Sequence, residues 1–145
     1  MTRRFKSVFV FVFTVLAAHI AMSQDFDMTR PATLKGQVAG VIFGAGNSYL
    51  LIDVSDASGK SQLWAVQGNA LDALTKDGWT PKGTVRPGDT VSVVTFQPRS
   101  SAKLAESLPP SIDMKILELA KTGHVLRGTE VTFANGKKMA FGSSN

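Results

Sequence analysis

The 145-residue chain contains no cysteine, which excludes a disulfide framework and the usual cysteine-based metal and redox sites. Charged residues make up only 19% of the chain and hydrophobic residues 43%, values typical of a globular protein and not of a disordered one. This length suffices for one well-buried domain and not for two, so a multidomain enzyme is excluded.

The first 23 residues have the three parts of a secretory signal peptide. The start is cationic, residues 8–20 are almost all apolar, and small residues precede Gln24. We predict cleavage after Ser23 and a periplasmic location, with no stable membrane insertion afterwards. The alternative, a retained membrane anchor, is disfavoured because the uncharged stretch is barely as long as a spanning helix needs.

The chain has five more basic than acidic residues, which at first suggests a nucleic-acid-binding protein. Arg3, Arg4 and Lys6 belong to the predicted signal, so the mature chain has an excess of only two. Its basic residues are scattered, with Lys137 and Lys138 the only adjacent pair. Binding to a polyanion draws its affinity from several cations together, and nucleic acid is therefore a disfavoured partner.

The mature chain predicts a mainly β fold. Residues 24–32 lack any period and are expected to be a flexible lead-in to a single barrel domain over residues 33–142. Apolar patterning predicts strands over 33–43, 49–54, 61–67, 90–96, 125–133 and 137–141. Three strands, a helix and further strands is the element order of the OB-fold, so we expect an OB-fold-like barrel of five to six strands with one helix between strands three and four.

That helix has clear boundaries in the sequence. Asn69 is expected to cap its start, and Gly78 is expected to end it in a left-handed conformation that places Trp79 against Leu74. The polar segment 97–111 contains three prolines and predicts a loop insertion.

The C-terminal part of the chain gives weaker signals. Residues 112–121 fit a strand or a helix, and their apolar spacing favours a possible second short helix, with Ser111 as its cap and Gly123 as its end. The dipeptide Asn135-Gly136 favours a type I′ hairpin turn.

Several stretches of the sequence resemble a known family. They are residues 31–38, 49–54, 63–66, 73–80 and 85–93, with Gly78-Trp79 and Pro87-Gly88-Asp89 as their most specific features. On these residues the chain is similar to small exported bacterial proteins of uncharacterised function, in which a signal peptide precedes one OB-like barrel. The resemblance implies a histidine pair at the mature N-terminus and an Asn-Pro-His loop, both suited to metal. Residues 24–27 and 44–48 of this chain hold no histidine.

The sequence offers no recognisable catalytic or metal-binding set. His124 is the only histidine of the mature chain, and one imidazole without cysteine cannot supply a typical zinc site, so we expect a surface residue. No serine lies in a nucleophile-elbow motif. Asp53, Asp56 and Asp89 are expected to cap turns. We predict no enzymatic activity, no bound metal and no cofactor.

Three residues are candidates for contact with a ligand. Trp64 and Trp79 fall on apolar registers and are expected in the core, which leaves Tyr49 as the aromatic for a binding surface. With Asn47 and Arg99 it would border one end of the barrel, between the loops after strands one and four.

The sequence therefore predicts a non-catalytic, OB-like binding or interaction module of the bacterial periplasm, whose partner is an unknown small ligand or another envelope protein. The first alternative is a binder of single-stranded nucleic acid or another polyanion through Arg86, Arg99, Lys115 and Lys137, which would lose affinity steeply with salt. The second alternative is a periplasmic metal-binding protein.

Overall fold

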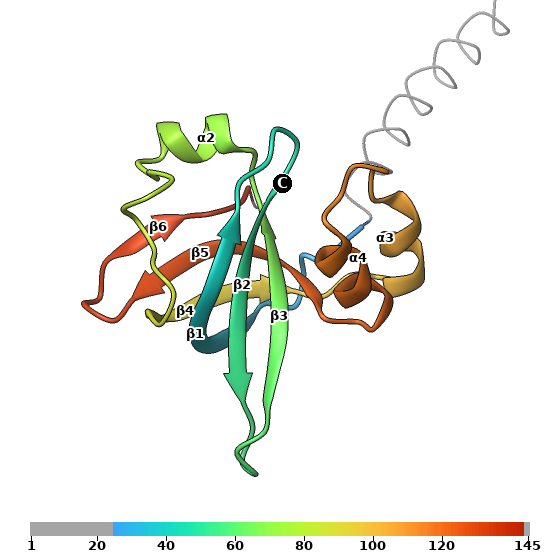
Figure 1. Cartoon of the computed structure of the whole chain (residues 1–145), viewed down its shortest axis with the longest axis horizontal. Coiled ribbons are helices and arrows are strands. Elements are labelled where there is room, and N and C mark those ends of the chain that lie inside the picture. Colours follow the sequence, from blue (N-terminus) through green and yellow to red (C-terminus); the bar gives the residue numbers. More distant parts are fainter. Residues whose placement is uncertain (1–24, 144–145) are drawn as a thin grey trace, which may run out of the picture.

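The computed structural model describes residues 25–143, and the predicted signal peptide lies outside these residues. The chain forms a closed barrel with an additional strand and short helices (Figure 1). The strands are β1 (Ala32–Ile42), β2 (Ser48–Ser55), β3 (Ser61–Gly68), β4 (Thr90–Phe96), β5 (Val125–Phe133) and β6 (Lys138–Ala140). The helices within the described residues are α2 (Leu71–Lys76), α3 (Ser101–Ser107) and α4 (Met114–Lys121). No helix of this part of the chain is long and apolar enough to cross a membrane.

The strand order confirms the predicted barrel. Neighbours run β3-β2-β1-β4-β5-β6, and a parallel pairing of β3 with β5 closes the first five strands into a ring. The strand β6 pairs with the C-terminal part of β5, beyond the residues that pair with β3, and forms the second arm of a hairpin. With α2 between β3 and β4, this is the connectivity of an OB-fold.

The first strand is bent, as its glycines predict. Its N-terminal half pairs with β4 and its C-terminal half with β2, and the register to β2 shifts between Val38 and Gly40. A side chain at Gly36 would collide with the carbonyl oxygen of Asp53 and the side chain of Ile52, whereas one at Gly40 would meet nothing within 4 Å. Of these two glycines, only Gly36 is therefore required by the close approach of β1 and β2.

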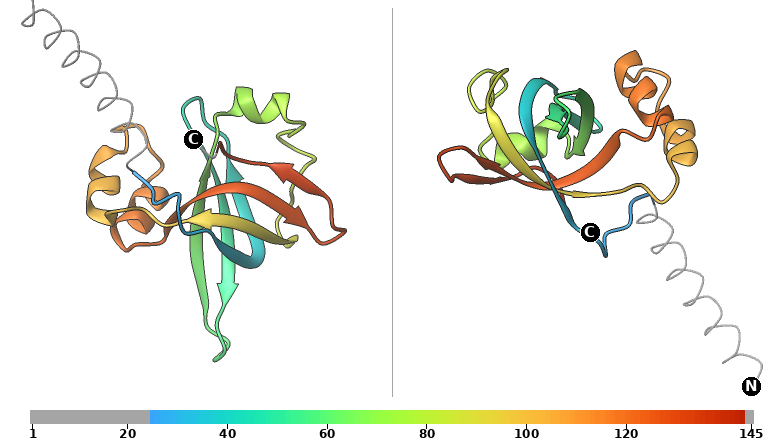
Figure 2. Two further views of the ribbon diagram at one scale, coloured as in Figure 1. Left: turned by 180° about the vertical axis from the view of Figure 1, so that it is seen from behind. Right: turned by 90° about the horizontal axis from the view of Figure 1, so that it is seen from below.

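Two separate apolar clusters stabilise the fold. The first fills the barrel and is closed at one end by α2, with fully buried Leu50, Val66, Leu74, Val93 and Phe141. The second lies on the outside of the barrel, between the outer face of β2, β3 and β5 and the helices α3 and α4. Figure 2 shows these two helices standing together on one side of the barrel.

The C-terminal end of α2 is as predicted, but its N-terminal cap is not. Gly78 ends the helix with a φ of 97°, and the Trp79 amide donates to the Leu74 carbonyl at 2.9 Å, as a Schellman ending requires. The cap was predicted wrongly: Ala70 occupies the N-cap without a side-chain bond. Asn69 instead accepts hydrogen bonds from Arg127 and Ser143, far away in the sequence.

The segment after β4 is more structured than expected. Residues 97–111, predicted as a loop insertion, contain α3, which begins at a Ser100 cap and buries Leu104. The second predicted helix is confirmed as α4, although Asp113 and not Ser111 caps it. The lead-in also takes part in packing, because Phe26 is buried in the second cluster and pairs with Pro98.

The turns use the residues that the sequence predicts, with two exceptions. Asp56 accepts from the backbone amides of Ser58 and Lys60, and Asp89 accepts from the Arg86 amide, but no such role falls to Asp53. The β5–β6 hairpin is not type I′, because Gly136 has positive φ and Asn135 does not. The Phe133 amide donates to the Lys137 carbonyl, so three residues form the loop.

Candidate ligand-binding site

A cavity of about 470 Å³ lies where the loop between β1 and β2 meets the connection between α3 and α4. Its apolar lining includes Ile42, Phe43, Pro109, Ile112 and Ile116. Ligand pockets have volumes of roughly 300 to 1,000 Å³ and combine apolar walls with a few polar groups. The cavity fits that description, since Asn47, Tyr49, Ser111 and Asp113 also border it.

The structure brings together two of the three predicted contact residues. Asn47 and Tyr49 line the same cavity, because the loop before β2 and the start of β2 carry both of them. Arg99 is not among the cavity residues. Its backbone amide donates to the Asp25 carbonyl at 3.0 Å. The hydrogen bonds from Thr29 lower the pKa of Asp27, and the positive charge of Arg99 lowers it further by a smaller amount.

The Tyr49 side chain is more buried than a surface contact residue would be. Only 2% of it is exposed, and it belongs to the cluster beneath α3 and α4. Its hydroxyl oxygen accepts a hydrogen bond from the Gln67 amide at 3.1 Å. Burial raises the pKa of Tyr49, so the phenol keeps its proton at neutral pH, although the bond from Gln67 acts in the opposite direction.

Gln67 connects Tyr49 to a residue that the sequence reading missed. Arg127 lies opposite Gln67 in the parallel pairing of β3 with β5 and donates to its side-chain oxygen at 3.5 Å. A second guanidinium nitrogen donates to Asn69 Oδ1 at 3.1 Å. Burial lowers the pKa of Arg127 below its usual value. The only feature of the sequence that could have indicated this contact is the presence of two polar residues, at positions 67 and 127, within apolar strands.

His124 has a packing role. It precedes β5 and is half-buried, its Nδ1 lies 2.8 Å from the Thr122 hydroxyl, and its ring meets that of Trp64 edge-on at 4.8 Å between centroids. Trp64 is only half-buried and belongs to neither core cluster, so its predicted core position is wrong, whereas Trp79 is buried as predicted. Among residues 25–143, no group of three or more His, Cys, Asp or Glu side chains is arranged to hold a metal ion.

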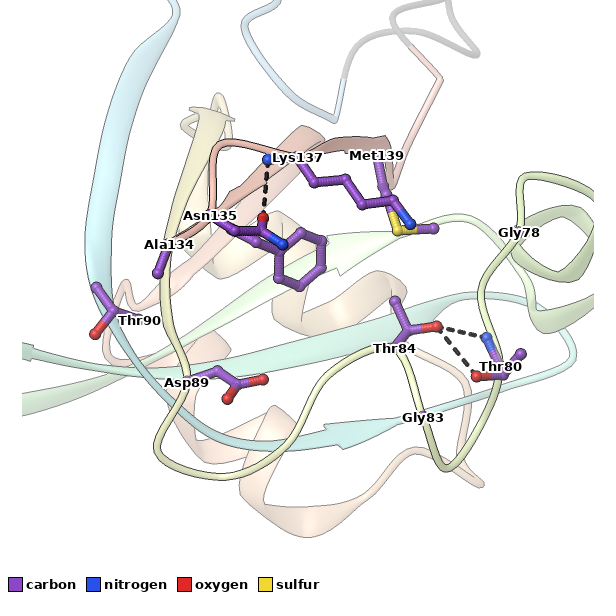
Figure 3. A pocket seen from close by; sticks show the side chains of 11 residues that line it. Gly78, Thr80, Gly83, Thr84, Asp89, Thr90, Ala134, Asn135, Lys137 and Met139 are labelled. Carbon is purple, nitrogen blue, oxygen red and sulfur yellow. Dashed lines mark hydrogen bonds between the residues drawn. The ribbon is translucent and has the colours of Figure 1, made fainter.

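A second cavity, of about 520 Å³, lies between the segment after α2 and the β5–β6 hairpin. Figure 3 shows Thr84 bonded to Thr80, and the Lys137 amide bonded to the Asn135 side chain. Asp89 likewise bonds to the backbone of its own turn. Because these polar groups already stabilise the turns that carry them, the first cavity is the better candidate site.

The comparisons with known proteins give a family and no function. The model of a family of unknown function, DUF6152, matches residues 9–106, more than half of the chain. The matched region contains Asn47 and Tyr49, whereas Arg127 lies beyond it. The search of curated proteins and the search of solved structures each returned no match.

Proposed function

The chain belongs to DUF6152, a family of unknown function, and from its cavity we propose that it is a non-catalytic binding module of the bacterial periplasm. Its ligand is a small molecule that enters the cavity between the β1–β2 loop and the α3–α4 connection. The cationic, apolar and small-residue segments of positions 1–23 support export with cleavage after Ser23.

The position of the cavity is the observation that carries this proposal. OB-folds bind their ligands on the outer face of strands two and three and on the adjoining loops. Here Tyr49 of β2 borders the cavity from that face, and Asn47 borders it from the first loop. A cavity of this size at this position fits a small ligand held between the loop and the helices.

The same face argues for a small ligand over single-stranded nucleic acid. Strand-binding OB-folds stack bases on exposed aromatic side chains. In this protein α3 and α4 cover Leu51 and Ala65 on the outer face, and Tyr49 is buried with them. A base would have to displace both helices before it could stack there.

Filling the cavity should weaken ligand binding. Ala45 is exposed and lines the cavity, so Ala45→Trp would occupy the space without disturbing either core. With the fluorescent probe 1-anilinonaphthalene-8-sulfonate, we expect Ala45→Trp to weaken binding at least about tenfold, or about 1.4 kcal/mol. Ala57→Trp, on the exposed β2–β3 turn, is the matched control and should bind as the unchanged protein does. Equal binding by both variants would place the probe elsewhere and contradict the proposal.

Export should produce a shortened protein. We expect mass spectrometry of the periplasmic fraction to find a chain that begins at Gln24, because the cleavage site follows Ser23. Replacing Ser23 with arginine should leave the uncleaved chain in the membrane fraction, since the enzyme that removes signals requires a small residue before the cut. Recovery of the full-length chain from the cytoplasm would contradict the proposed location.

A further inference from the structure

A row of polar side chains crosses the outer face of the barrel next to the cavity. Tyr49 on β2 lies directly opposite Gln67 on β3, and Gln67 lies directly opposite Arg127 on β5. The Gln67 side-chain amide connects the other two residues, because its nitrogen donates to the Tyr49 hydroxyl and its oxygen accepts from the Arg127 guanidinium. Tyr49 belongs both to this row and to the cavity wall, so the row starts at the cavity. Gln67, Asn69 and Arg127 continue it away from the cavity wall.

The row has more hydrogen-bond donors than acceptors. The Gln67 side-chain oxygen and Asn69 Oδ1 already accept from Arg127, and Asn69 Oδ1 also accepts from the amide and hydroxyl of Ser143. The Tyr49 oxygen accepts from Gln67, which leaves its own proton to donate. The remaining guanidinium N–H groups and the Asn69 amide nitrogen are donors as well. A group that only accepts hydrogen bonds is the complement of this set.

The charge of Arg127 points to the same kind of group. Its guanidinium is half-buried, and among residues 25–143 no carboxylate lies within 4 Å of it. Its protein partners are the neutral amides of Gln67 and Asn69. A charge removed from water is costly without an opposite charge nearby, and arginine pairs with carboxylate and phosphate groups in particular.

We propose that Arg127, Tyr49 and Asn69 bind the carboxylate or phosphate head group of an amphipathic ligand whose apolar part lies in the cavity. This inference rests on the proposed function, because it gives the chemical class of the ligand in that same cavity. The apolar wall formed by Phe43, Ile112 and Ile116 would hold the hydrocarbon part. The polar row, in which Asn69 and Arg127 are half-buried, would hold the charged end.

Eight-carbon compounds with different head groups test this assignment. The probes are octanoate, octyl phosphate and octanol, titrated into the purified protein and followed by calorimetry at constant ionic strength. We expect one of the two anions to bind at least about tenfold more tightly than octanol, as a charge-assisted hydrogen bond to a half-buried arginine allows. The stronger of the two identifies carboxylate or phosphate as the natural head group.

Substitution of Arg127 should remove the preference for the anion. In Arg127→Gln we expect the anion and octanol to bind within about twofold of each other, whereas Arg86→Gln, which removes an exposed arginine, keeps the full preference. Tyr49→Phe keeps the ring and removes the proton, and should reduce the preference severalfold. It also serves as the second variant if Arg127→Gln fails to fold. A preference that survives both substitutions overturns the inference.

Chain length separates failure of the inference from failure of the proposed function. Binding in an apolar cavity should tighten about fourfold for each added CH₂ from butyrate to octanoate. If affinity rises with length but octanol binds as tightly as octanoate, the cavity binds ligands and the role of Arg127 is wrong. If butyrate and octanoate bind equally and Arg127→Gln abolishes both, the anion site stands and the cavity proposal fails.

Discussion

Replacing Trp79 with alanine should lower the free energy of unfolding by about 3–5 kcal/mol. The indole is 1% exposed and belongs to the cluster inside the barrel. Its Nε1 donates to the Ala140 carbonyl at 2.7 Å, and its ring lies against those of Phe133 and Phe141, with centroids 6.2 and 5.2 Å away. Alanine would leave a large cavity and an unpaired carbonyl. A small domain is stabilised by about 5–15 kcal/mol in total, so the loss should be severe.

Urea unfolding followed by far-UV circular dichroism measures this effect. Trp64→Ala is the matched control, because it removes the same side chain from a half-buried position against His124. We expect the control to lose distinctly less stability than Trp79→Ala. Equal losses in the two variants would contradict the prediction that burial in the barrel core makes Trp79 contribute more to stability than Trp64.

The barrel could be predicted from the sequence because its signals are local. Each strand has its own apolar pattern, and Gly78-Trp79 marks the end of α2 by a motif that spans only a few residues. Once the order of three strands, a helix and more strands was recognised, the OB connectivity restricted the possible pairings. The bent β1 likewise follows from glycine placement, since Gly36 allows β1 and β2 to approach.

The errors arose where distant residues determine the role of a side chain. Asn69 has the composition of a helix cap, but Arg127 and Ser143 occupy its oxygen. The helix α3 was missed because the prolines around it indicate a loop, whereas its stability comes from burial of Leu104 under the second cluster. Contacts of this kind cannot be read from a local pattern.

The candidate site was predicted only in the part that lies within one segment. Asn47 and Tyr49 are two residues apart, so the loop and the start of β2 place them together whatever the rest of the fold does. Arg127 reaches Tyr49 only through the parallel pairing of β3 with β5, which closes the barrel. The sequence contains the residue but not the register that brings it there.

The division of the core into two clusters has a consequence for the site. The barrel interior includes Trp79 and is enclosed by the strands and α2, whereas α3 and α4 pack on the outside through residues such as Ile116 and Ala120. The cavity lies at the edge of the outer cluster. Changes in the outer cluster should therefore alter the site while the barrel keeps its structure.

Ile116→Ala should lower the free energy of unfolding by about 2–5 kcal/mol and weaken ligand binding at the same time. Ile116 is fully buried between α4 and the sheet, and it also lines the cavity. Met114, on the same helix, is 67% exposed, so Met114→Ala should change stability by no more than about 0.5 kcal/mol. Urea unfolding and titration with 1-anilinonaphthalene-8-sulfonate measure the two effects.

The two tryptophan indole N–H signals in the ¹H–¹⁵N NMR spectrum report separately on the barrel core, which contains Trp79, and on the junction of α4 and β5, where Trp64 contacts His124. In Ile116→Ala we expect the Trp64 signal to shift, because Trp64 meets His124 and the His124 amide bonds to the Leu119 carbonyl in α4. The Trp79 signal should stay in place, since its partner is the Ala140 carbonyl at the other end of the barrel core. If both signals move together, the clusters form one cooperative core, and the helices cannot adjust to a ligand independently of the barrel.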